Sequence, residues 1–166
     1  MRNSNVLFMA QSAMIAAIYV VLTLVFKPFS YGEIQVRISE SLTILPLFTP
    51  AAIPGLFIGC LLANILGGCV AADIIFGSLA TLIAAFLTYQ LRKSSPFLAP
   101  LPPVLINAAI IPLILRYASG FSVPLIILVL SVGVGQVISC GILGLLLYNV
   151  LNKYKVQIFG DKTFSQ

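Results

Sequence analysis

The residues able to do chemistry in this chain are few, and most are carboxylates and amides. The candidates for a binding site are Glu33, Arg37, Glu40, Asn64, Asp73 and Gln136. A carboxylate accepts hydrogen bonds and neutralises a cation, whereas an amide both donates and accepts. An ionised side chain at the centre of a bilayer costs roughly 2.5 to 3.5 kcal/mol, so such groups in an apolar chain are expected to face the bundle interior or a watery cavity. These residues are therefore the best guides to a site.

The chain contains few side chains of the types that catalyse reactions or bind metal ions. The chain has no histidine, only four acidic residues and three cysteines without a C-x-x-C pair. A metal site of ordinary zinc spacing is not expected, and an integral membrane enzyme would need positioned proton-transfer groups that this composition hardly offers. We expect no cofactor and no catalytic residues.

The composition is that of an integral membrane protein. Of the 166 residues, 60% are hydrophobic and 8% are charged, and the mean hydropathy is +1.13. The stretch from Val6 to Phe26 carries no charge and would be about 31 Å long as a helix, which matches a hydrocarbon core of about 30 Å. The net charge of +5 does not indicate nucleic-acid binding, because the basic residues lie at the ends of apolar stretches.

The pattern predicts one all-α transmembrane domain over residues 1–166, with both termini in the cytoplasm. The expected spans are residues 6–26, 40–49, 51–68, 73–91, 101–118 and 122–151. The second and third share an uncharged stretch from Ser41 to Ala72 that contains Pro46, Pro50 and Pro54. Each proline removes a helical hydrogen bond and disfavours helix in the residue before it, so we expect a turn at Thr49 and Pro50.

Charge counting leaves a five-span alternative open. Six spans place six basic residues inside and three outside: Arg2, Arg92, Lys93, Lys153, Lys155 and Lys162 against Lys27, Arg37 and Arg116. Five spans with an external amino terminus give seven against two, which fits the positive-inside bias better. We prefer six spans because prolines at four-residue spacing make one continuous helix hard to build.

The six-span prediction makes the segment from Lys27 to Glu40 an external loop over the outer mouth. Apolar and polar residues alternate from Glu33 to Ser39, which is typical of an extended strand, although Glu33, Arg37 and Glu40 also fit helical spacing. A solvated loop with an internal ion pair is the alternative.

Depth along the predicted spans brings Glu40, Asn64 and Asp73 together near the outer mouth, with Gln136 deeper. Each has a structural alternative. Asp73 is well placed to cap the fourth span, and Asn64 and Gln136 could join neighbouring helices.

Small residues line one face of the first span. Ala13 and Ala17 form a small-x-x-x-small pair that Ala10 extends, so a partner helix could approach closely. The alternative is that these alanines pack inside the chain's own bundle.

Several blocks of the chain resemble one family. They are QVRISESLTILPLFTPAAIPGLFIGCLLANILGG, DIIFGSLATLIAAFLTYQLR, LAPLPPVLINA and VGVGQVISCGILG, in that order. They are similar to the QueT-type queuosine-precursor transporters, the substrate-binding (S) components of energy-coupling factor (ECF) transporters. The resemblance implies six membrane helices, a site beneath the loop between the first two spans, and partnership with a transmembrane scaffold subunit and two cytoplasmic ATPases. It also implies that the A-x-x-x-A pair on the first helix contacts the scaffold.

The cargo implied by the resemblance is a 7-deazaguanine precursor of queuosine. Glu40 and Asp73 are the first candidates for its donor edge or cationic arm, Asn64 and Gln136 for polar edges, and Glu33 and Arg37 for loop closure. The chain has no G-x-x-x-x-G-K-[ST] phosphate loop, which is consistent with ATPases in trans. The alternatives are an S component for another vitamin or nucleobase-like molecule, and an autonomous carrier in the cell membrane.

Overall fold

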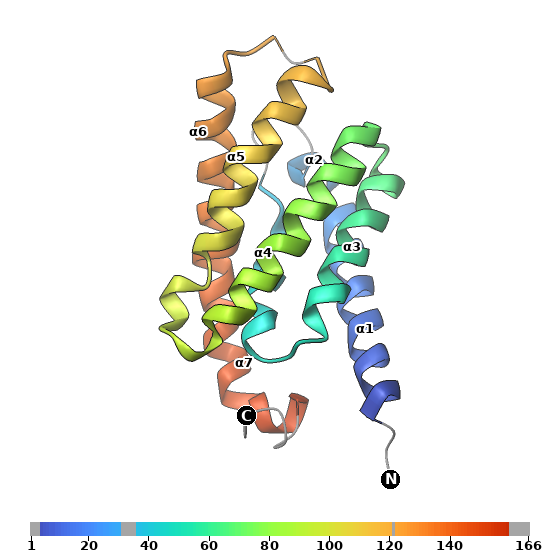
Figure 1. Ribbon diagram of the computed structural model, residues 1–166, viewed down its shortest axis with the longest axis vertical. Coiled ribbons are helices and arrows are strands. Elements are labelled where there is room, and N and C mark those ends of the chain that lie inside the picture. The colour runs from blue at the N-terminus through green and yellow to red at the C-terminus, as the bar shows by residue number, and fades with distance from the viewer. Residues whose placement is uncertain (1–3, 31–35, 121, 160–166) are drawn as a thin grey trace.

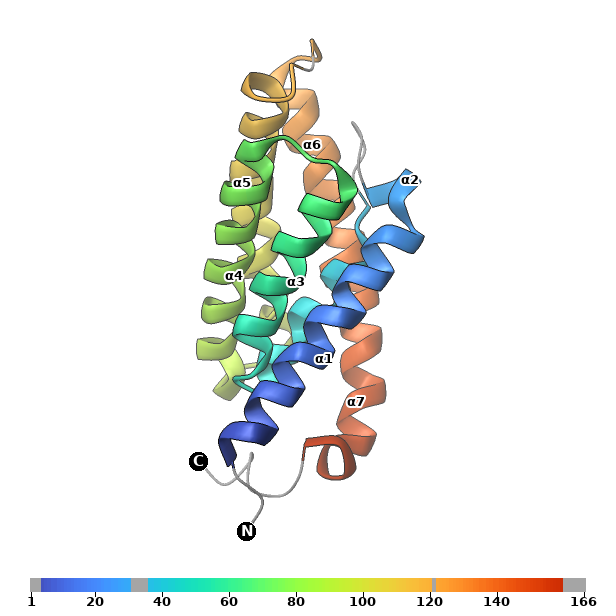
Figure 2. The ribbon, with the colours of Figure 1, turned by 90° about the vertical axis from the view of Figure 1, so that its right-hand side faces the viewer.

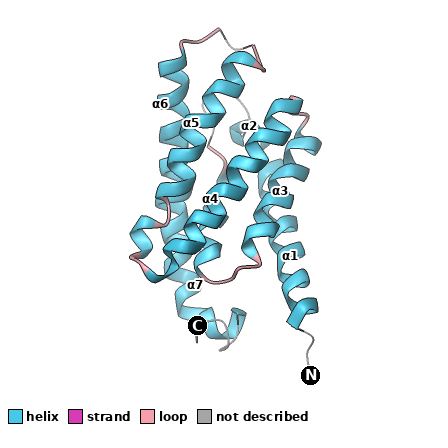
Figure 3. Cartoon of the chain, viewed as in Figure 1, coloured by secondary structure: helices cyan, strands magenta, loops and turns pink. Residues whose placement is uncertain are grey.

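The computed structural model describes residues 4–30, 36–120 and 122–159. Every regular element in these ranges is a helix (Figure 3), so the prediction of an all-α protein is confirmed. The elements are α1 (Ser4–Val25), α2 (Lys27–Ser30), η1 (Ile38–Leu47), α3 (Ala52–Gly67), η2 (Asp73–Gly77), α4 (Ser78–Gln90), η3 (Leu91–Lys93), η4 (Pro96–Leu98), α5 (Leu101–Tyr117), α6 (Leu125–Gln136), η5 (Val137–Leu143) and α7 (Gly144–Phe159).

By their order in the chain, the described elements form six passes, made by α1, by η1, by α3, by η2 with α4, by α5, and by α6 with η5 and α7. The labelled helices lie side by side in one bundle (Figure 1). Four helical stretches are long and apolar enough to cross a membrane: Ser4–Val25, Asp73–Lys93, Pro96–Tyr117 and Leu125–Phe159. The passes η1 and α3 are shorter, at 10 and 16 residues. In both ribbon views the start of α1 and the end of α7 lie at the same end of the molecule, which we call the termini end (Figure 2). The architecture is that of a multi-pass membrane protein.

The turn between η1 and α3 contains Thr49 and Pro50, where the prolines predicted it. Pro46 lies inside η1, and Pro54 lies in the first turn of α3, where a missing backbone N–H removes no helical hydrogen bond. The structure therefore divides this uncharged region into two helices, where the five-span alternative required one continuous span.

The η1 segment is a 3₁₀ helix rather than the α-helical span that the sequence suggested. At about 2.0 Å per residue its length is about 20 Å, compared with about 15 Å for an α-helix of the same ten residues. It packs against α1, α3, α4, η5 and α7, and its residues from Ser39 to Pro46 are buried. Because 3₁₀ stretches of more than four residues are uncommon, this element is an unusual centre for the bundle. It carries Glu40 into the interior.

Close packing of α1 against α3 depends on two glycines of α3. A Cβ at Gly55 would lie 2.8 Å from the Ser12 carbonyl oxygen, and a Cβ at Gly59 would lie 2.8 Å from Tyr19 Cβ and 3.1 Å from Ala16 Cα. The α1 face that packs here comprises Ser12, Ile15, Ala16, Tyr19 and Thr23, all of them buried. The glycines therefore fix how Tyr19 and Thr23 approach η1.

Gly59→Ala is expected to destabilise the protein by about 1 to 3 kcal/mol, because the added methyl group meets backbone atoms of α1 that cannot move independently. Thermal unfolding of the detergent-purified protein measures this. The control is Gly133→Ala in α6, where the nearest atom to an added Cβ is 3.9 Å away and alanine is expected to be neutral or stabilising. Equal melting temperatures for the two variants would contradict the close approach of α1 and α3.

Candidate functional site

A buried ion pair joins η1 to the start of the fourth pass. The Arg37 guanidinium donates from Nη2 to Asp73 Oδ2 at 3.2 Å and from Nε to the Ser30 carbonyl at 3.1 Å. Arg37 is 4% exposed and Asp73 is 7% exposed. Since Arg37 immediately precedes η1, the pair ties the beginning of η1 to both α2 and η2.

Glu40 lies one turn further along η1 and is held by α1. The Tyr19 hydroxyl donates to Glu40 Oε1 at 2.6 Å, and the Thr23 hydroxyl forms a 2.6 Å hydrogen bond with Ser39 Oγ. Tyr19 and Glu40 are at most 1% exposed. The Glu40 backbone N–H also donates to the Arg37 carbonyl at 3.0 Å, so Glu40, Arg37 and Asp73 form one connected cluster.

Asn64 holds the other side of Asp73. Its Nδ2 donates to the Asp73 carbonyl at 3.2 Å, and its Oδ1 lies 3.9 Å from Cys69 Sγ. Burial, together with the nearby Asp73 carboxylate, raises the pKa of the Cys69 thiol to about 12, so this thiol stays protonated at neutral pH. Asn64 thus joins α3 to η2, as expected of an amide between neighbouring helices, and at the same time positions Asp73.

Gln136 reaches the cluster through a cysteine. Cys140 Sγ lies 3.1 Å from Gln136 Oε1 and 3.5 Å from the Glu40 carbonyl oxygen. Gln136 is 4% exposed and Cys140 is 1% exposed. This contact links the last pass to η1, so the described cluster takes residues from α1, η1, α3, η2 and the α6–η5 junction.

Three irregular helical segments meet at this cluster. Besides the 3₁₀ segment η1, the segments η2 and η5 are π-helical, the first beginning at Asp73 and the second containing Ser139 and Cys140. The η5 segment packs against η1, and η2 packs against α3 and α5. Because π-turns within α-helices are frequent at functional sites, this distribution supports the cluster as the candidate site.

Each carboxylate of the cluster has one oxygen bound by the protein and one without a hydrogen-bond partner. Within the described residues, the buried side-chain atoms without a hydrogen-bond partner are Glu40 Oε2, Asp73 Oδ1 and Ser139 Oγ. Leaving a buried acceptor unpaired costs about 1 to 3 kcal/mol, and more when it is charged. Two carboxylates against one arginine also leave excess negative charge. The arrangement can therefore bind a ligand that donates hydrogen bonds, and it favours a positively charged one.

The structure corrects two interpretations of these residues. The alternative for Arg37 and Glu40 was that they lie in a solvated loop and pair within it. Both are instead buried, and Arg37 forms its ion pair with Asp73. Asp73 was expected to have helix capping as its alternative, but Ala72 before it already has helical dihedral angles, φ −62° and ψ −41°, and no side-chain capping bond forms. Helix formation begins before Asp73, which frees its carboxylate for Arg37.

Two further expectations lie at or beyond the limits of the described residues. Glu33, a candidate for loop closure, falls outside them, as does most of the alternating segment. Of that segment, Val36 and Arg37 have no regular structure and the helix begins at Ile38.

Sequence reasoning missed the side chains that α1 contributes. Ser12, Ala16, Tyr19 and Thr23 recur at spacings of four, three and four residues, which is the inner face of one helix. This helical spacing could have been recognised in the sequence. The partners of these residues could not, since Tyr19 and Glu40 are 21 residues apart in the chain.

The alanines of α1 lie on the opposite face of that helix. Ala10, Ala13 and Ala17 are all exposed. Internal packing of this stripe, the alternative to partner contact, is therefore wrong.

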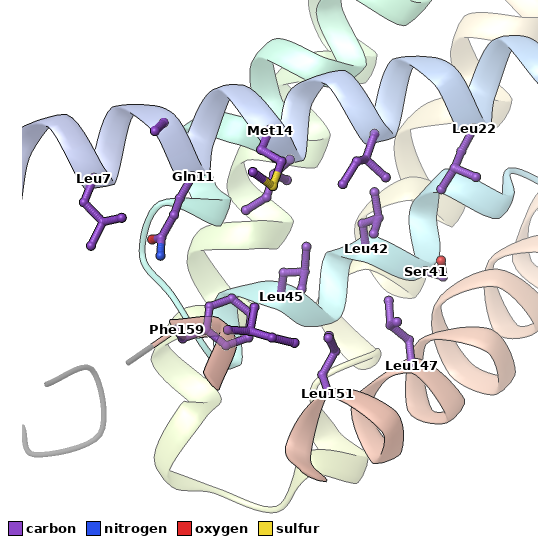
Figure 4. A pocket seen from close by; sticks show the side chains of 14 residues that line it. Leu7, Gln11, Met14, Leu22, Ser41, Leu42, Leu45, Leu147, Leu151 and Phe159 are labelled. Atoms are coloured by element: carbon purple, nitrogen blue, oxygen red, sulfur yellow. The ribbon is translucent and has the colours of Figure 1, made fainter. Parts of the chain in front are cut away.

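A large apolar groove opens beside the same helix. Its volume is about 680 Å³, and it lies between α1, η1 and α7 (Figure 4). Leu7, Met14 and Leu22 of α1 face Leu42 and Leu45 of η1 and Leu147 and Leu151 of α7. With Gln11 and Ser41 as its only polar lining residues, the groove does not suit a polar heterocycle. No group of three or more metal-ligand side chains occurs in the described part of the chain.

Gly77→Ala is expected to weaken binding at the cluster, because a Cβ there would lie 2.7 Å from Asp73 Oδ1 and would push the carboxylate away from Arg37. Gly141→Ala in η5 is the control, since its Cβ would meet only Val137 Cγ1, at 3.8 Å. Calorimetry with each purified variant measures the dissociation constant for the 7-deazaguanine base that the family resemblance implies. Unchanged binding by Gly77→Ala would show that Asp73 can move without consequence for the ligand.

The comparisons with known proteins identify one family. The QueT transporter family matches residues 9–153, from α1 into α7. The queuosine precursor transporter QueT of Lactococcus lactis subsp. cremoris (strain MG1363) is 37% identical over 68 residues, which cover 40% of this chain and 40% of that protein. The matched part thus spans less than half of the curated relative, and no solved structure matches the chain significantly. Because the family match extends over nearly all of the bundle, this chain belongs to the QueT transporter family.

Proposed function

We propose that this chain is the substrate-binding membrane component of an ECF-type importer, and that its cargo is a queuosine precursor with a 7-deazaguanine base. The observation that carries the proposal is the pair of buried carboxylates, Glu40 and Asp73, each with one oxygen left without a partner. The name of the Lactococcus relative supports the choice of cargo.

The chemistry of a 7-deazaguanine complements this cluster. The base offers ring and exocyclic N–H donors to carboxylate oxygens and a ring carbonyl acceptor to an arginine or amide donor. One precursor also carries a cationic aminomethyl arm, which a carboxylate would neutralise. Glu40 and Asp73 would bind the donor edge or the cation, with Asn64 and Gln136 positioning them.

Entry of the ligand would require the Arg37 to Asp73 pair to open. Arg37 is the last residue of the connection between α2 and η1, and Asp73 is the first residue of η2. Their ion pair would therefore close the cluster where this connection meets η2. In this proposal the Arg37 side chain moves away from Asp73 to admit the base and returns once the base is bound.

Energy for transport would come from partners, namely a transmembrane scaffold subunit and two cytoplasmic ATPases. We assign the scaffold contact to the exposed stripe Ala10, Ala13 and Ala17, where small side chains allow close helix approach. The chain itself would catalyse no bond chemistry.

Ala17→Leu is therefore expected to abolish most uptake in cells that supply the complete transporter, while precursor binding by the purified chain stays unchanged. Ala109→Leu, on the exposed surface of α5, is the matched control and is expected to leave both activities intact. Normal uptake by Ala17→Leu would contradict the assignment of the scaffold contact to this stripe. An equal loss of uptake in Ala17→Leu and Ala109→Leu would contradict it as well.

The proposed cargo is tested by a ligand panel on the detergent-purified chain, consisting of the aminomethyl and cyano 7-deazaguanines, guanine, thiamine and riboflavin. We expect the deazaguanines to bind most tightly. Tight binding of thiamine or riboflavin instead would retain the architecture and replace the cargo. Uptake by vesicles that contain this chain alone would favour an autonomous carrier over a subunit that needs ATPases.

A further inference from the structure

A second polar cavity lies at the termini end, away from the carboxylate cluster. Its volume is about 170 Å³, and it is formed where the end of η1, the η3–η4 connection and α7 meet. Its polar lining comprises Arg92, Ser94, Tyr148, Asn152 and Lys155. It therefore offers two cationic groups and several hydrogen-bonding groups from segments far apart in the chain.

Among the described residues, the charged side chains that line this cavity are both cationic, Arg92 and Lys155. None of its lining residues is acidic, and Lys93 and Lys153 lie exposed beside it in the chain. The two carboxylates in the described residues, Glu40 and Asp73, are committed to the buried cluster. An anion is the ligand that this charge distribution favours.

Arg92 is held in a defined orientation. Its guanidinium carbon lies 4.0 Å from the centroid of the Tyr89 ring, one helical turn earlier. Stacking uses the face of the guanidinium and leaves the N–H donors at its edge, in the geometry that suits a phosphate. The cavity thus contains an oriented phosphate-binding group as well as positive charge.

Exposed apolar and aromatic side chains lie close in the chain to the residues that line the cavity. Phe97 and Leu98 of η4 are 75% and 41% exposed, and Tyr154 on α7 is 50% exposed. Apolar and aromatic side chains that project from the ends of membrane helices belong at the boundary between acyl chains and headgroups. A lipid bound there would place its phosphate at the cavity and its chains against these residues.

We propose that this cavity binds the phosphate headgroup of an anionic phospholipid. Arg92 and Lys155 contact the phosphate, while Ser94 and Asn152 bind its oxygens or the headgroup hydroxyls. Basic pockets between membrane helices are known to bind such headgroups. The site is independent of the precursor site and does not depend on the cargo.

The test compares phosphatidylglycerol with phosphatidylcholine of the same acyl chains, using native mass spectrometry of the full purified chain. We expect the anionic lipid to be retained preferentially, and the preference to fall about tenfold in the Arg92→Gln, Lys155→Gln double variant. The matched control is Lys93→Gln, Lys153→Gln, which removes the same charge at the same end but outside the cavity lining. It is expected to keep most of the preference.

Three results would overturn the proposal. The first is no preference for the anionic lipid in the unmodified chain. The second is equal loss in the two double variants, because general surface charge would then explain the preference. The third is competition by millimolar inorganic phosphate or glycerol phosphate as effective as by the lipid, since the ligand would then be a soluble anion. Circular dichroism of each variant establishes that the helices are retained.

Discussion

Glu40→Gln is expected to lower the affinity for the aminomethyl 7-deazaguanine about a hundredfold, which corresponds to about 2.7 kcal/mol. Glu40 is 1% exposed, and its Oε1 already accepts a hydrogen bond from Tyr19. Its Oε2 has no hydrogen-bond partner among the described residues, and a carboxylate at this position would pair with a cationic arm. Glutamine keeps the size and the Tyr19 contact but removes the charge, so the loss should be much larger for the cation than for the neutral cyano base.

Calorimetry with both bases on both proteins measures this ratio. Tyr19→Phe is the control, because it removes the donor to Oε1 and leaves the charge of Glu40 in place. It should weaken the two bases by a similar, smaller factor. If Glu40→Gln weakens the cationic and neutral bases equally, Glu40 does not recognise the charge of the ligand.

Asp73→Asn is expected to destabilise the protein by about 3 to 5 kcal/mol and to lower its melting temperature by about 10 °C. The reason is that Arg37, at 4% exposure, would keep its charge without the carboxylate that compensates it. Differential scanning fluorimetry in detergent measures the shift. Precursor binding should fall at least a hundredfold in the same variant.

The double variant Arg37→Met, Asp73→Asn separates folding from binding. Replacing both members of a buried ion pair is often nearly neutral, so most of the lost stability should return. Binding should stay lost, since Asp73 Oδ1 and the Arg37 donors would both be missing. Recovery of binding together with stability would mean that the pair is structural and that the ligand lies elsewhere.

Much of the fold could be predicted because membrane insertion imposes strong periodic constraints. Long uncharged stretches give the passes, and prolines at four-residue spacing predict the break near Thr49 and Pro50 that the structure contains. The 3₁₀ form of η1 could not be predicted. It depends on tertiary packing against several other elements, which overrides the local preference of ISESLTILPL.

The candidate site could be predicted in part for the same reason. The scarcity of polar residues singled out Glu40, Asn64, Asp73 and Gln136, and the structure brings them into one connected network. The ion pair between Arg37 and Asp73 spans 36 positions in the chain, and no local pattern encodes such a pairing. Tyr19 was missed because an aromatic residue in an apolar span resembles ordinary core until its hydroxyl has a partner.

The most direct test of the central claim is a structure of the chain with the aminomethyl 7-deazaguanine bound. We expect the base among η1, η2 and η5, with its N–H donors within hydrogen-bond distance of Glu40 Oε2 and Asp73 Oδ1. Electron density for the base in the apolar groove between α1 and α7, with the carboxylate cluster unchanged, would contradict the account.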